Sequence, residues 1–212
     1  MLYVKIKADK QAILQKIINS RVFVDKGWVA AEKIARRKFN QTQGLFFREF
    51  MEHPVTQEIL AGPNIDDNPS GLMGGRGNLF SFFGFDEGEN PIADVSLYLQ
   101  SQFDLSRSSY RTKQWTFKVR MPDKEKVAEY VVGKYGATYT SESWIDGVEK
   151  GYSGLNYYLR FSGKGRSSGG IQVKGVVNEV TFTTTKYMSE LTENFKNRMQ
   201  RSTTQPLKQL GL

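Results

Sequence analysis

The sequence has no cysteine and only one histidine, His53, among its 212 residues. Without cysteine it cannot form a disulfide framework, a thiolate zinc site, an iron–sulfur cluster or a thiol nucleophile. One histidine excludes a two-histidine metal site, and no serine–histidine–aspartate arrangement can be argued around it. We therefore expect no metal, no cofactor and no enzymatic activity. His53 precedes Pro54, and we interpret it as a residue that begins a helix.

Long apolar runs are also absent. No stretch approaches the roughly 18 residues of a membrane span, and the charged opening MLYVKIKADK is unlike a secretory signal peptide. Hydrophobic residues make up 39% and charged residues 25% of the chain, which is ordinary usage and enough for a sizeable core. The composition predicts a soluble protein of a reducing compartment with no membrane partner.

Charge is plentiful but unevenly distributed. The net charge is +8, yet residues 1–51 carry 11 basic and 4 acidic residues, residues 52–104 carry 1 and 9, and residues 105–212 carry 18 and 9. A strongly basic chain suggests a nucleic-acid partner. The basic–acidic–basic order instead favours contacts between copies of the chain, one sign against the other.

Hydrophobic periodicity predicts an α+β fold, with N-terminal helices followed by a mostly antiparallel sheet with packed helices. The expected helices start near Lys10 and cover about 28–41, 54–61, 92–102, 122–135 and 186–201. A loop is expected at 24–27, and 45–51 extends the second helix after a break at Gly44. Expected strands are 2–8, 108–121, 155–161, 170–173 and 179–185, with a short pairing or turning segment at 143–148.

Composition divides the chain into four regions. Residues 1–61 form the N-terminal strand and helical region, and residues 62–91 form a Gly-rich extended arm followed by an aromatic strand. Residues 92–201 form the sheet-and-helix core, and residues 202–212 an extended tail. Glycine, proline and asparagine clusters mark the second region.

The second region holds two motifs. GLMGGRGN at 71–78, which contains Arg76, lacks the Lys-Ser/Thr of a phosphate loop and precedes an expected strand, so it is interpreted as a hinge or arm. The aromatic run after it is expected in the core or at a subunit interface. Base stacking is disfavoured because acidic residues follow at once. The run contains Phe80, Phe82, Phe83 and Phe85.

Three charged groups have both a structural and a functional interpretation. Lys164 and Arg166, in the flexible loop 163–170, lie at a solvated hairpin tip or touch DNA phosphates without sequence preference. Lys33, Arg36 and Arg37 form a solvated helix face, or receive the acidic 86–94 stretch of a neighbouring copy. The pairs Asp66–Asp67 and Asp86–Glu87 have no activated partner nearby, so a catalytic use has no support.

The stretch EHPVTQEILAGPNIDDNPSGLMGGRGNLFSFFGF, residues 52–85, resembles tail-completion or neck (head–tail connector) proteins of tailed double-stranded-DNA bacteriophages. The resemblance rests on HPVT-x-EI, AGP and G-x-GNLFSFFGF, followed by an acidic turn to Pro91. It covers about a third of the chain.

The resemblance implies a non-enzymatic virion protein, assembled in the host cytoplasm, that forms a ring at the head–tail junction. Its partners would be copies of itself, the neighbouring connector, portal-side and tail proteins, and double-stranded DNA through non-specific contact. Arg76 and the four phenylalanines would lie at subunit contacts, and Lys164 and Arg166 would face the DNA channel.

Three alternatives remain open at this stage. The chain could be another tail subunit, a terminator or a baseplate protein. It could be a basic nucleic-acid-binding module that uses the aromatic strand and the basic loop. A small hydrolase built on the acidic clusters is the least favoured, because nucleophile and base signals are missing.

Overall fold

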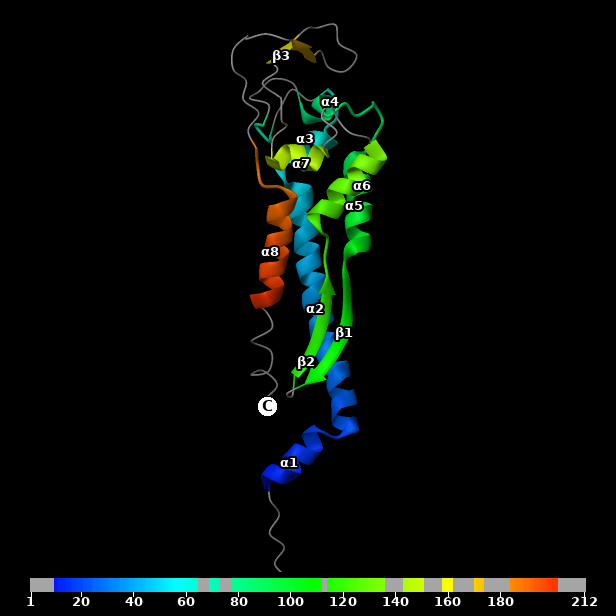
Figure 1. Cartoon of the computed structure of the whole chain (residues 1–212), viewed down its shortest axis with the longest axis vertical. Coiled ribbons are helices and arrows are strands. Elements are labelled where there is room, and N and C mark those ends of the chain that lie inside the picture. Colours follow the sequence, from blue (N-terminus) through cyan, green and yellow to red (C-terminus); the bar gives the residue numbers. More distant parts are fainter. Residues whose placement is uncertain are drawn as a thin grey trace, which may run out of the picture. The chain divides into compact units, whose positions relative to one another are not determined.

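The computed structural model describes residues 10–64, 69–72, 78–111, 114–135, 143–150, 158–161, 170–173 and 184–201. These residues are mostly helical, with two antiparallel strand pairs (Figure 1). The expected N-terminal helices are confirmed, and the described strands pair antiparallel as expected. The mostly antiparallel sheet expected after them is wrong for the described residues, which form two separate two-stranded pairs among helices. The chain divides into unit 1, within residues 1–41 and 104–120, and unit 2, within residues 42–103 and 121–212. The two units are described separately below.

Unit 1 begins with helix α1 (Lys10–Ile18) and continues into the long helix α2 (Arg21–Glu52), which passes into unit 2 after Gln41. The helix start near residue 10 is confirmed. The loop expected at 24–27 and the break expected at Gly44 are wrong, since α2 is continuous through both. A glycine inside a helix costs only about 1 kcal/mol, which the packing of a long helix offsets.

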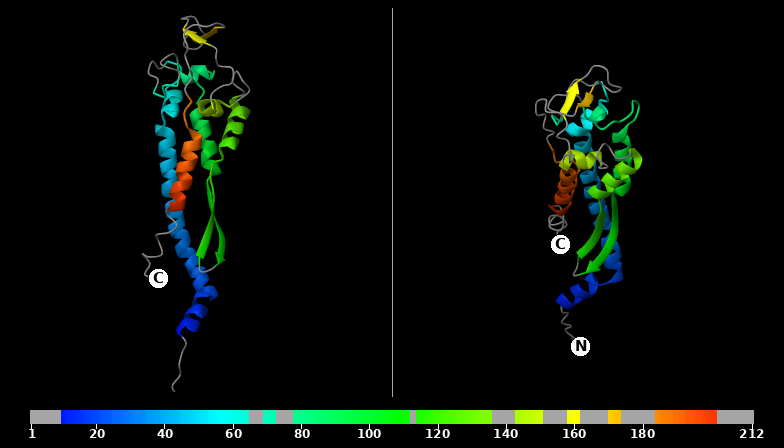
Figure 2. Two further views of the ribbon diagram at one scale, coloured as in Figure 1. Left: turned by 60° about the vertical axis from the view of Figure 1, so that its left-hand side comes forward. Right: turned by 45° about the horizontal axis from the view of Figure 1, so that its top comes forward.

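A β-hairpin completes unit 1. Strand β1 (Asp104–Arg111) pairs antiparallel with β2 (Gln114–Arg120), and both strands lie along the unit 1 part of α2 in the views of Figures 1 and 2. The single strand expected at 108–121 is therefore wrong, because its two ends belong to different strands. The expected alternation along β2 is confirmed, since alternate side chains are half-buried and exposed. The half-buried ones are Trp115, Phe117 and Val119.

An irregularity in β1 decides which side chains face the helix. The register shifts between Arg107 and Ser109, so Arg107 pairs with Phe117 and Tyr110 pairs with Trp115. Arg107 and Tyr110 are three residues apart, whereas their partners are two apart. The extra residue in β1 is a β-bulge. Because side chains alternate between the two faces of a strand, the bulge changes which of the residues after it lie on each face of the hairpin. Tyr110 therefore joins Trp115 on one face, with ring centroids 5.0 Å apart.

Aromatic contacts join the hairpin to α2. Trp28 meets Phe117 edge-on at 5.5 Å, and Phe23 lies 6.1 Å from Trp115. Gly27 provides the space for the indole of Trp115, since a Cβ built on Gly27 would lie 2.0 Å from Cζ2 of that ring. An isolated two-stranded hairpin is marginally stable, so these contacts with the helix hold the ribbon in place.

Unit 2 contains the remaining helices. After α2 come α3 (Pro54–Leu60), α4 (Leu79–Phe82), α5 (Pro91–Gln102), α6 (Lys124–Tyr135), α7 (Trp144–Lys150) and α8 (Met188–Arg201). The helices expected near 54–61, 92–102, 122–135 and 186–201 are confirmed. Strands β3 (Tyr158–Phe161) and β4 (Gly170–Val173) pair antiparallel, within the strands expected at 155–161 and 170–173.

Two segments of unit 2 correct the sequence-based expectation. The short segment expected to pair or turn at 143–148 lies in helix α7, which the Ser143 hydroxyl caps by accepting from the Ile145 N–H at 3.2 Å. The aromatic strand expected at 78–85 is instead the short helix α4 and the turn after it. Asn78 caps that helix. Gly84, at φ +74°, follows it in a left-handed conformation that favours glycine.

Aromatic side chains fill the core of unit 2. Phe46 on α2 lies 6.3 Å from Phe195 on α8, and Phe103 lies within 5.1 Å of both rings. Figure 2 shows α8 alongside this part of α2 in both of its views. Across the described residues, no helix is both long and apolar enough to cross a membrane. The strand expected at 2–8 and the tail at 202–212 lie outside the described residues, as does most of 179–185.

Candidate functional site

The motif at residues 52–85 begins with a helix cap. His53 occupies the N-cap of α3, its Nδ1 accepts a hydrogen bond from Val55 N at 3.2 Å, and Pro54 follows as the first helical residue. The helix start expected at His53 is confirmed. The imidazole ring also lies 4.7 Å from the ring of Tyr187, and its burial lowers the pKa of His53. A neutral imidazole keeps the acceptor that the cap needs.

Glu58 ties the connection between α3 and α4 to the core. Its side chain is fully buried, and its Oε1 accepts from Leu79 N at 2.9 Å. Its Oε2 accepts from Ser70 N at 3.1 Å and from the Ser70 hydroxyl. Burying a carboxylate is costly unless hydrogen bonds compensate it, and three donors do so here. One side chain therefore holds two points of the connection, residues 70 and 79.

Asn78 also holds the connection between α3 and α4, through a second set of hydrogen bonds. Its Nδ2 donates to the Pro63 carbonyl at 2.8 Å, while its Oδ1 accepts from Ser81 N at 2.9 Å. The ends of the Gly-rich segment are thereby held together at Pro63 and Asn78. Residues 65–68 and 73–77, including Arg76, lie outside the described residues. The role of this segment as an arm therefore stays a prediction.

The sequence analysis considered other carboxylates and missed Glu58. The signal that could have found it is its position on α3. Val55, Thr56 and Ile59 form the buried face of that helix, and Glu58 lies three residues after Val55 on the same face. A charged residue on an apolar helix face is almost never fully buried unless it is paired. Its partners are donors on residues twelve and twenty-one positions away, Ser70 and Leu79, which sequence spacing does not reveal.

Three of the four phenylalanines proposed for a subunit contact are buried within the chain. Phe83 and Phe85 lie 5.7 Å and 6.1 Å from the ring of Trp144, and Phe80 lies 5.4 Å from Phe85. The sequence left two interpretations open for these residues, the core of the chain and a subunit interface. Within the single chain, these three residues lie in the core. Phe82 is only half-buried and is the member of the group that reaches the surface. Contact with a neighbouring subunit stays a prediction.

A buried polar pair joins α3 to the segment before α8. The Thr56 and Tyr187 hydroxyls are 2.7 Å apart, and both side chains are fully buried. Burial raises the pKa of the Tyr187 phenol well above its usual range, so the group stays a neutral hydrogen-bonding partner. The pair fixes Tyr187 beneath the capping imidazole of His53.

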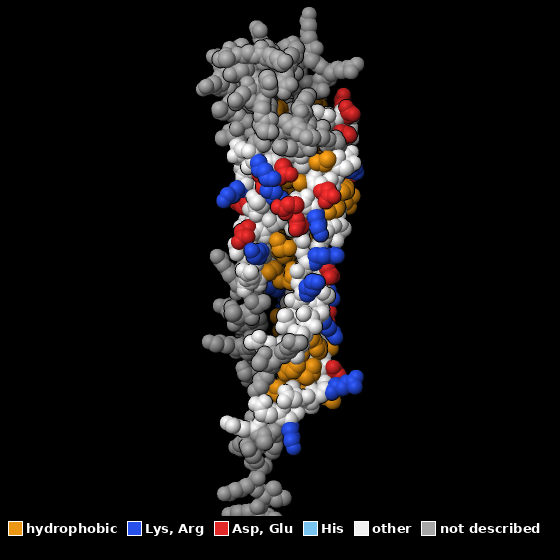
Figure 3. Space-filling view, in the orientation of Figure 1, with side chains coloured by type: hydrophobic (Ala, Val, Ile, Leu, Met, Phe, Trp, Pro, Cys, Tyr) orange, Lys and Arg blue, Asp and Glu red, His pale blue; other side chains and the backbone are white. Residues whose placement is uncertain are grey.

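The Glu149 carboxylate binds groups at the start of α8 and at the start of α6. It accepts from Tyr187 N at 3.2 Å and Ser189 N at 2.6 Å, and it pairs with Lys124 at 2.9 Å. Burial alone would raise the pKa of Glu149, but the Ser189 hydrogen bond and Lys124 outweigh it and the pKa is lowered. Figure 3 shows acidic and basic side chains interleaved where α6, α7 and α8 meet.

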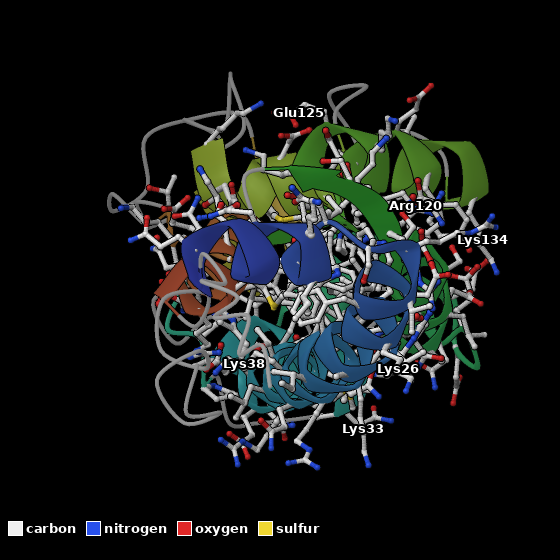
Figure 4. The ribbon with its side chains drawn as sticks, turned by 90° about the horizontal axis from the view of Figure 1, so that it is seen from below. Lys26, Lys33, Lys38, Arg120, Glu125 and Lys134 are labelled. Atoms are coloured by element: carbon white, nitrogen blue, oxygen red, sulfur yellow. The ribbon has the colours of Figure 1, made fainter. Side chains whose placement is uncertain are left out.

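In unit 1, the basic side chains of α2 differ in whether they form ion pairs. Glu32 binds Arg36 at 2.8 Å and Arg107 of β1 at 2.6 Å, and its pKa is lowered by the hydrogen bond from Arg107 and then by that from Arg36. Lys33 and Arg37 are exposed and make no ion pair among the residues that the structure describes. In Figure 4, Lys26 and Lys33 are directed outward from α2.

In unit 2, an acidic turn precedes α5. Asp86, Glu87 and Glu89 are all exposed, and Glu89 Oε2 accepts from Asp86 N at 2.8 Å. Gly88, at φ +95°, allows the tight reversal. Asp94, at the first turn of α5, forms an ion pair with Lys134 at 2.7 Å, and the charge of Glu89 also acts on Lys134. The turn therefore presents negative charge to the surface.

The other proposed functional residues are not brought into a site. Lys164 and Arg166, as well as Asp66 and Asp67, lie outside the described residues. Within the part that is described, no group of three metal-ligating side chains comes together. Comparison of the chain with protein-family models, curated proteins and solved structures finds no match. What the chain does is therefore inferred from its own residues.

Proposed function

We propose that this chain is a structural virion subunit that forms a ring at the head–tail junction of a tailed double-stranded-DNA bacteriophage. In this role, neck or tail completion, it joins the portal side to the tail around the DNA channel. The ring contacts copies of the same chain and the neighbouring connector, portal-side and tail proteins. It is assembled in the host cytoplasm and needs no cofactor or catalytic residue.

The observation that carries the proposal is the structural role of the polar residues in the motif at 52–85. His53 and Asn78 cap helices, Glu58 fastens the Gly-rich connection, and Thr56 supports Tyr187. The polar side chains on which the resemblance rests thus hold this segment in a defined shape. A subunit that must present a fixed surface to its neighbours requires such a scaffold.

The same proposal assigns a role in the ring to particular segments of the chain. The connection at 62–77, fixed at both ends, is the arm that reaches a neighbouring subunit, and Phe82 and Arg76 lie at that contact. The strand-containing part of the chain and its packed helices form the body of the ring, and Lys164 and Arg166 face the channel. Surfaces of opposite charge on one chain favour head-to-tail contacts, which form a ring when the rotation from copy to copy closes.

Electron microscopy of the purified protein and of the virion tests this function. The expected result is a ring in solution and the same ring between head and tail, with unjoined heads and tails in particles made without the protein. A strictly monomeric protein, together with normally joined particles in its absence, would overturn the proposal. Density at the tail end or the distal tip would instead identify a terminator or a baseplate subunit.

The second candidate function is a basic nucleic-acid-binding module. The exposed basic side chains of α2 favour it, but the aromatic strand that it also needed is a short helix with its phenylalanines mostly buried. It predicts DNA binding that weakens steeply with salt and is lost when Lys164 and Arg166 are replaced by alanine. Binding that is insensitive to both changes would exclude this candidate.

A further inference from the structure

One face of α2 in unit 1 is both basic and apolar. Residues 22, 26, 29, 33 and 37 are spaced by three or four positions, so they lie on one side of the helix. Val22 and Val29 are 65% and 66% exposed, and Lys26, Lys33 and Arg37 are exposed as well. We name these five residues the basic stripe.

The basic stripe lies apart from the side of α2 that holds the hairpin. Trp28 and Phe23 make the ring contacts with β2, and Glu32 binds Arg107 of β1. Valine is a weaker helix former than alanine, and two exposed valines gain no burial in return within the single chain. The face therefore has features of a surface that is covered by a partner.

A surface of unit 2 has the complementary character. Asp86, Glu87 and Glu89 are exposed in the turn before α5, and Leu97 on α5 is 64% exposed. We name these four residues the acidic corner. Leu97 is six residues after Pro91, the first residue of α5, which places it about 9 Å along the helix from that residue.

The two surfaces are complementary in charge, and each carries exposed apolar side chains. On the basic stripe, Lys33 and Arg37 follow Val29 by about 6 Å and 12 Å along α2. An exposed leucine on the helix that follows the acidic turn can therefore meet an exposed valine while the carboxylates meet the cations. Between residues 21 and 41 there are six basic and two acidic residues, whereas 86–94 holds four acidic and no basic residues.

We propose that the basic stripe of one copy binds the acidic corner of a second copy. The contact joins two different surfaces of the same chain, so it is head-to-tail and repeats from subunit to subunit. This inference rests on the proposed ring and names the surfaces that close it. A second copy fits better than DNA because the stripe alternates cations with exposed valines, which a phosphate backbone does not cover.

Charge reversal tests the contact. The variants are K33E/R37E on the stripe and D86K/E87K on the corner. The control K118E/K126E makes the same charge change as K33E/R37E at two exposed positions outside both surfaces. Sedimentation velocity measures self-association at low and high salt. Each reversed surface is expected to weaken association about tenfold or more, with little change in the control.

Recombining the variants separates this contact from general loss of fold. A mixture of K33E/R37E and D86K/E87K proteins brings an acidic stripe against a basic corner, and a basic stripe against an acidic corner. Association is therefore expected to return in the mixture, and also in the chain that carries all four changes. Carbodiimide cross-linking of an isotope-labelled and an unlabelled copy is expected to join Lys33 to Asp86 or Glu87 between chains.

The outcomes distinguish this inference from the proposed ring. If the wild-type protein forms rings and K33E/R37E associates as well as the control, the stripe–corner contact is wrong and the ring stands. If the wild-type protein does not associate, both fail. If K33E/R37E loses DNA binding while its self-association is unchanged, the stripe is a nucleic-acid surface and the inference is overturned.

Discussion

Replacing Glu58 by alanine removes the side chain that fastens the Gly-rich connection. Its carboxylate accepts hydrogen bonds from Leu79 N and from both donors of Ser70. After the change, the Leu79 N–H stays buried without an acceptor, because Leu79 itself is fully buried. The Ser70 donors are half-buried, so water can replace part of their interaction.

The expected loss of stability is about 4 kcal/mol. A buried donor left without its charged acceptor costs about 2 kcal/mol. The two Ser70 donors add about 1 kcal/mol together, and the one removed buried methylene adds about 1 kcal/mol. The sum is a large part of the 5–15 kcal/mol by which domains are typically stable. Glu58→Gln keeps one acceptor and nearly the same volume, so its expected loss is about 2 kcal/mol.

Urea unfolding and amide hydrogen exchange measure the effect. The free energy of unfolding reports the total loss, and exchange at Leu79 N and Ser70 N reports whether the connection has opened. Glu129→Ala, at an exposed position of α6, is the control and is expected to change stability by less than about 0.5 kcal/mol. A Glu58→Ala protein within about 1 kcal/mol of wild type, with Leu79 still protected, would refute the reasoning.

Three further predictions concern single side chains. Gly27→Ala is expected to destabilise the protein by about 1–3 kcal/mol, because the new Cβ meets the indole ring of Trp115 on β2. Gly44→Ala, where a Cβ meets nothing within 4 Å, is expected to stabilise the protein by about 0.5–1 kcal/mol. Urea titrations measure both, and equal effects would contradict this account. Thr56→Val leaves the Tyr187 hydroxyl unpaired and costs about 1–3 kcal/mol, while Tyr187→Phe in the Thr56→Val background is expected to recover part of it in a double-mutant cycle. The pKa of His53 is lowered in the folded state, so its contribution to stability is full above the unfolded pKa of about 6.5 and falls as the pH drops towards the folded pKa. His53→Asn retains a cap acceptor and is expected to remove this pH dependence of the free energy of unfolding. An unchanged pH profile would show that His53 is not its source.

Local signals in the sequence were sufficient for several helices. Pro54 and Pro91 begin α3 and α5 as expected, because proline at the first helical position gives up no hydrogen bond that the helix would make. The sequence likewise predicts an apolar stripe on α8 made of Met188, Leu191, Phe195 and Met199; the first three are buried, and Met199 is half-buried. In each case, residues within one or two turns hold the information.

The aromatic run illustrates where local pattern failed. Phe80 and Phe82 alternate as in a strand, but in α4 and its C-cap the buried residues are Leu79, Phe80 and Phe83, at helical spacing. The cap at Asn78 and the carboxylate of Glu58 hold the first turn. One of these partners is twenty-one residues away from Leu79, so the choice between helix and strand depended on tertiary contacts.

The sequence by itself determines the residue content of the chain and the order of its charges. The missing cysteine, the lone histidine and the order of the charge blocks follow from composition and need no coordinates. Only the tertiary structure decided that Glu58 is a buried anchor, that Gly27 admits the indole of Trp115, and which cations of α2 remain exposed. The physical reason is that burial and pairing are properties of neighbours brought together by folding, while residue type and sequence period are properties of the chain.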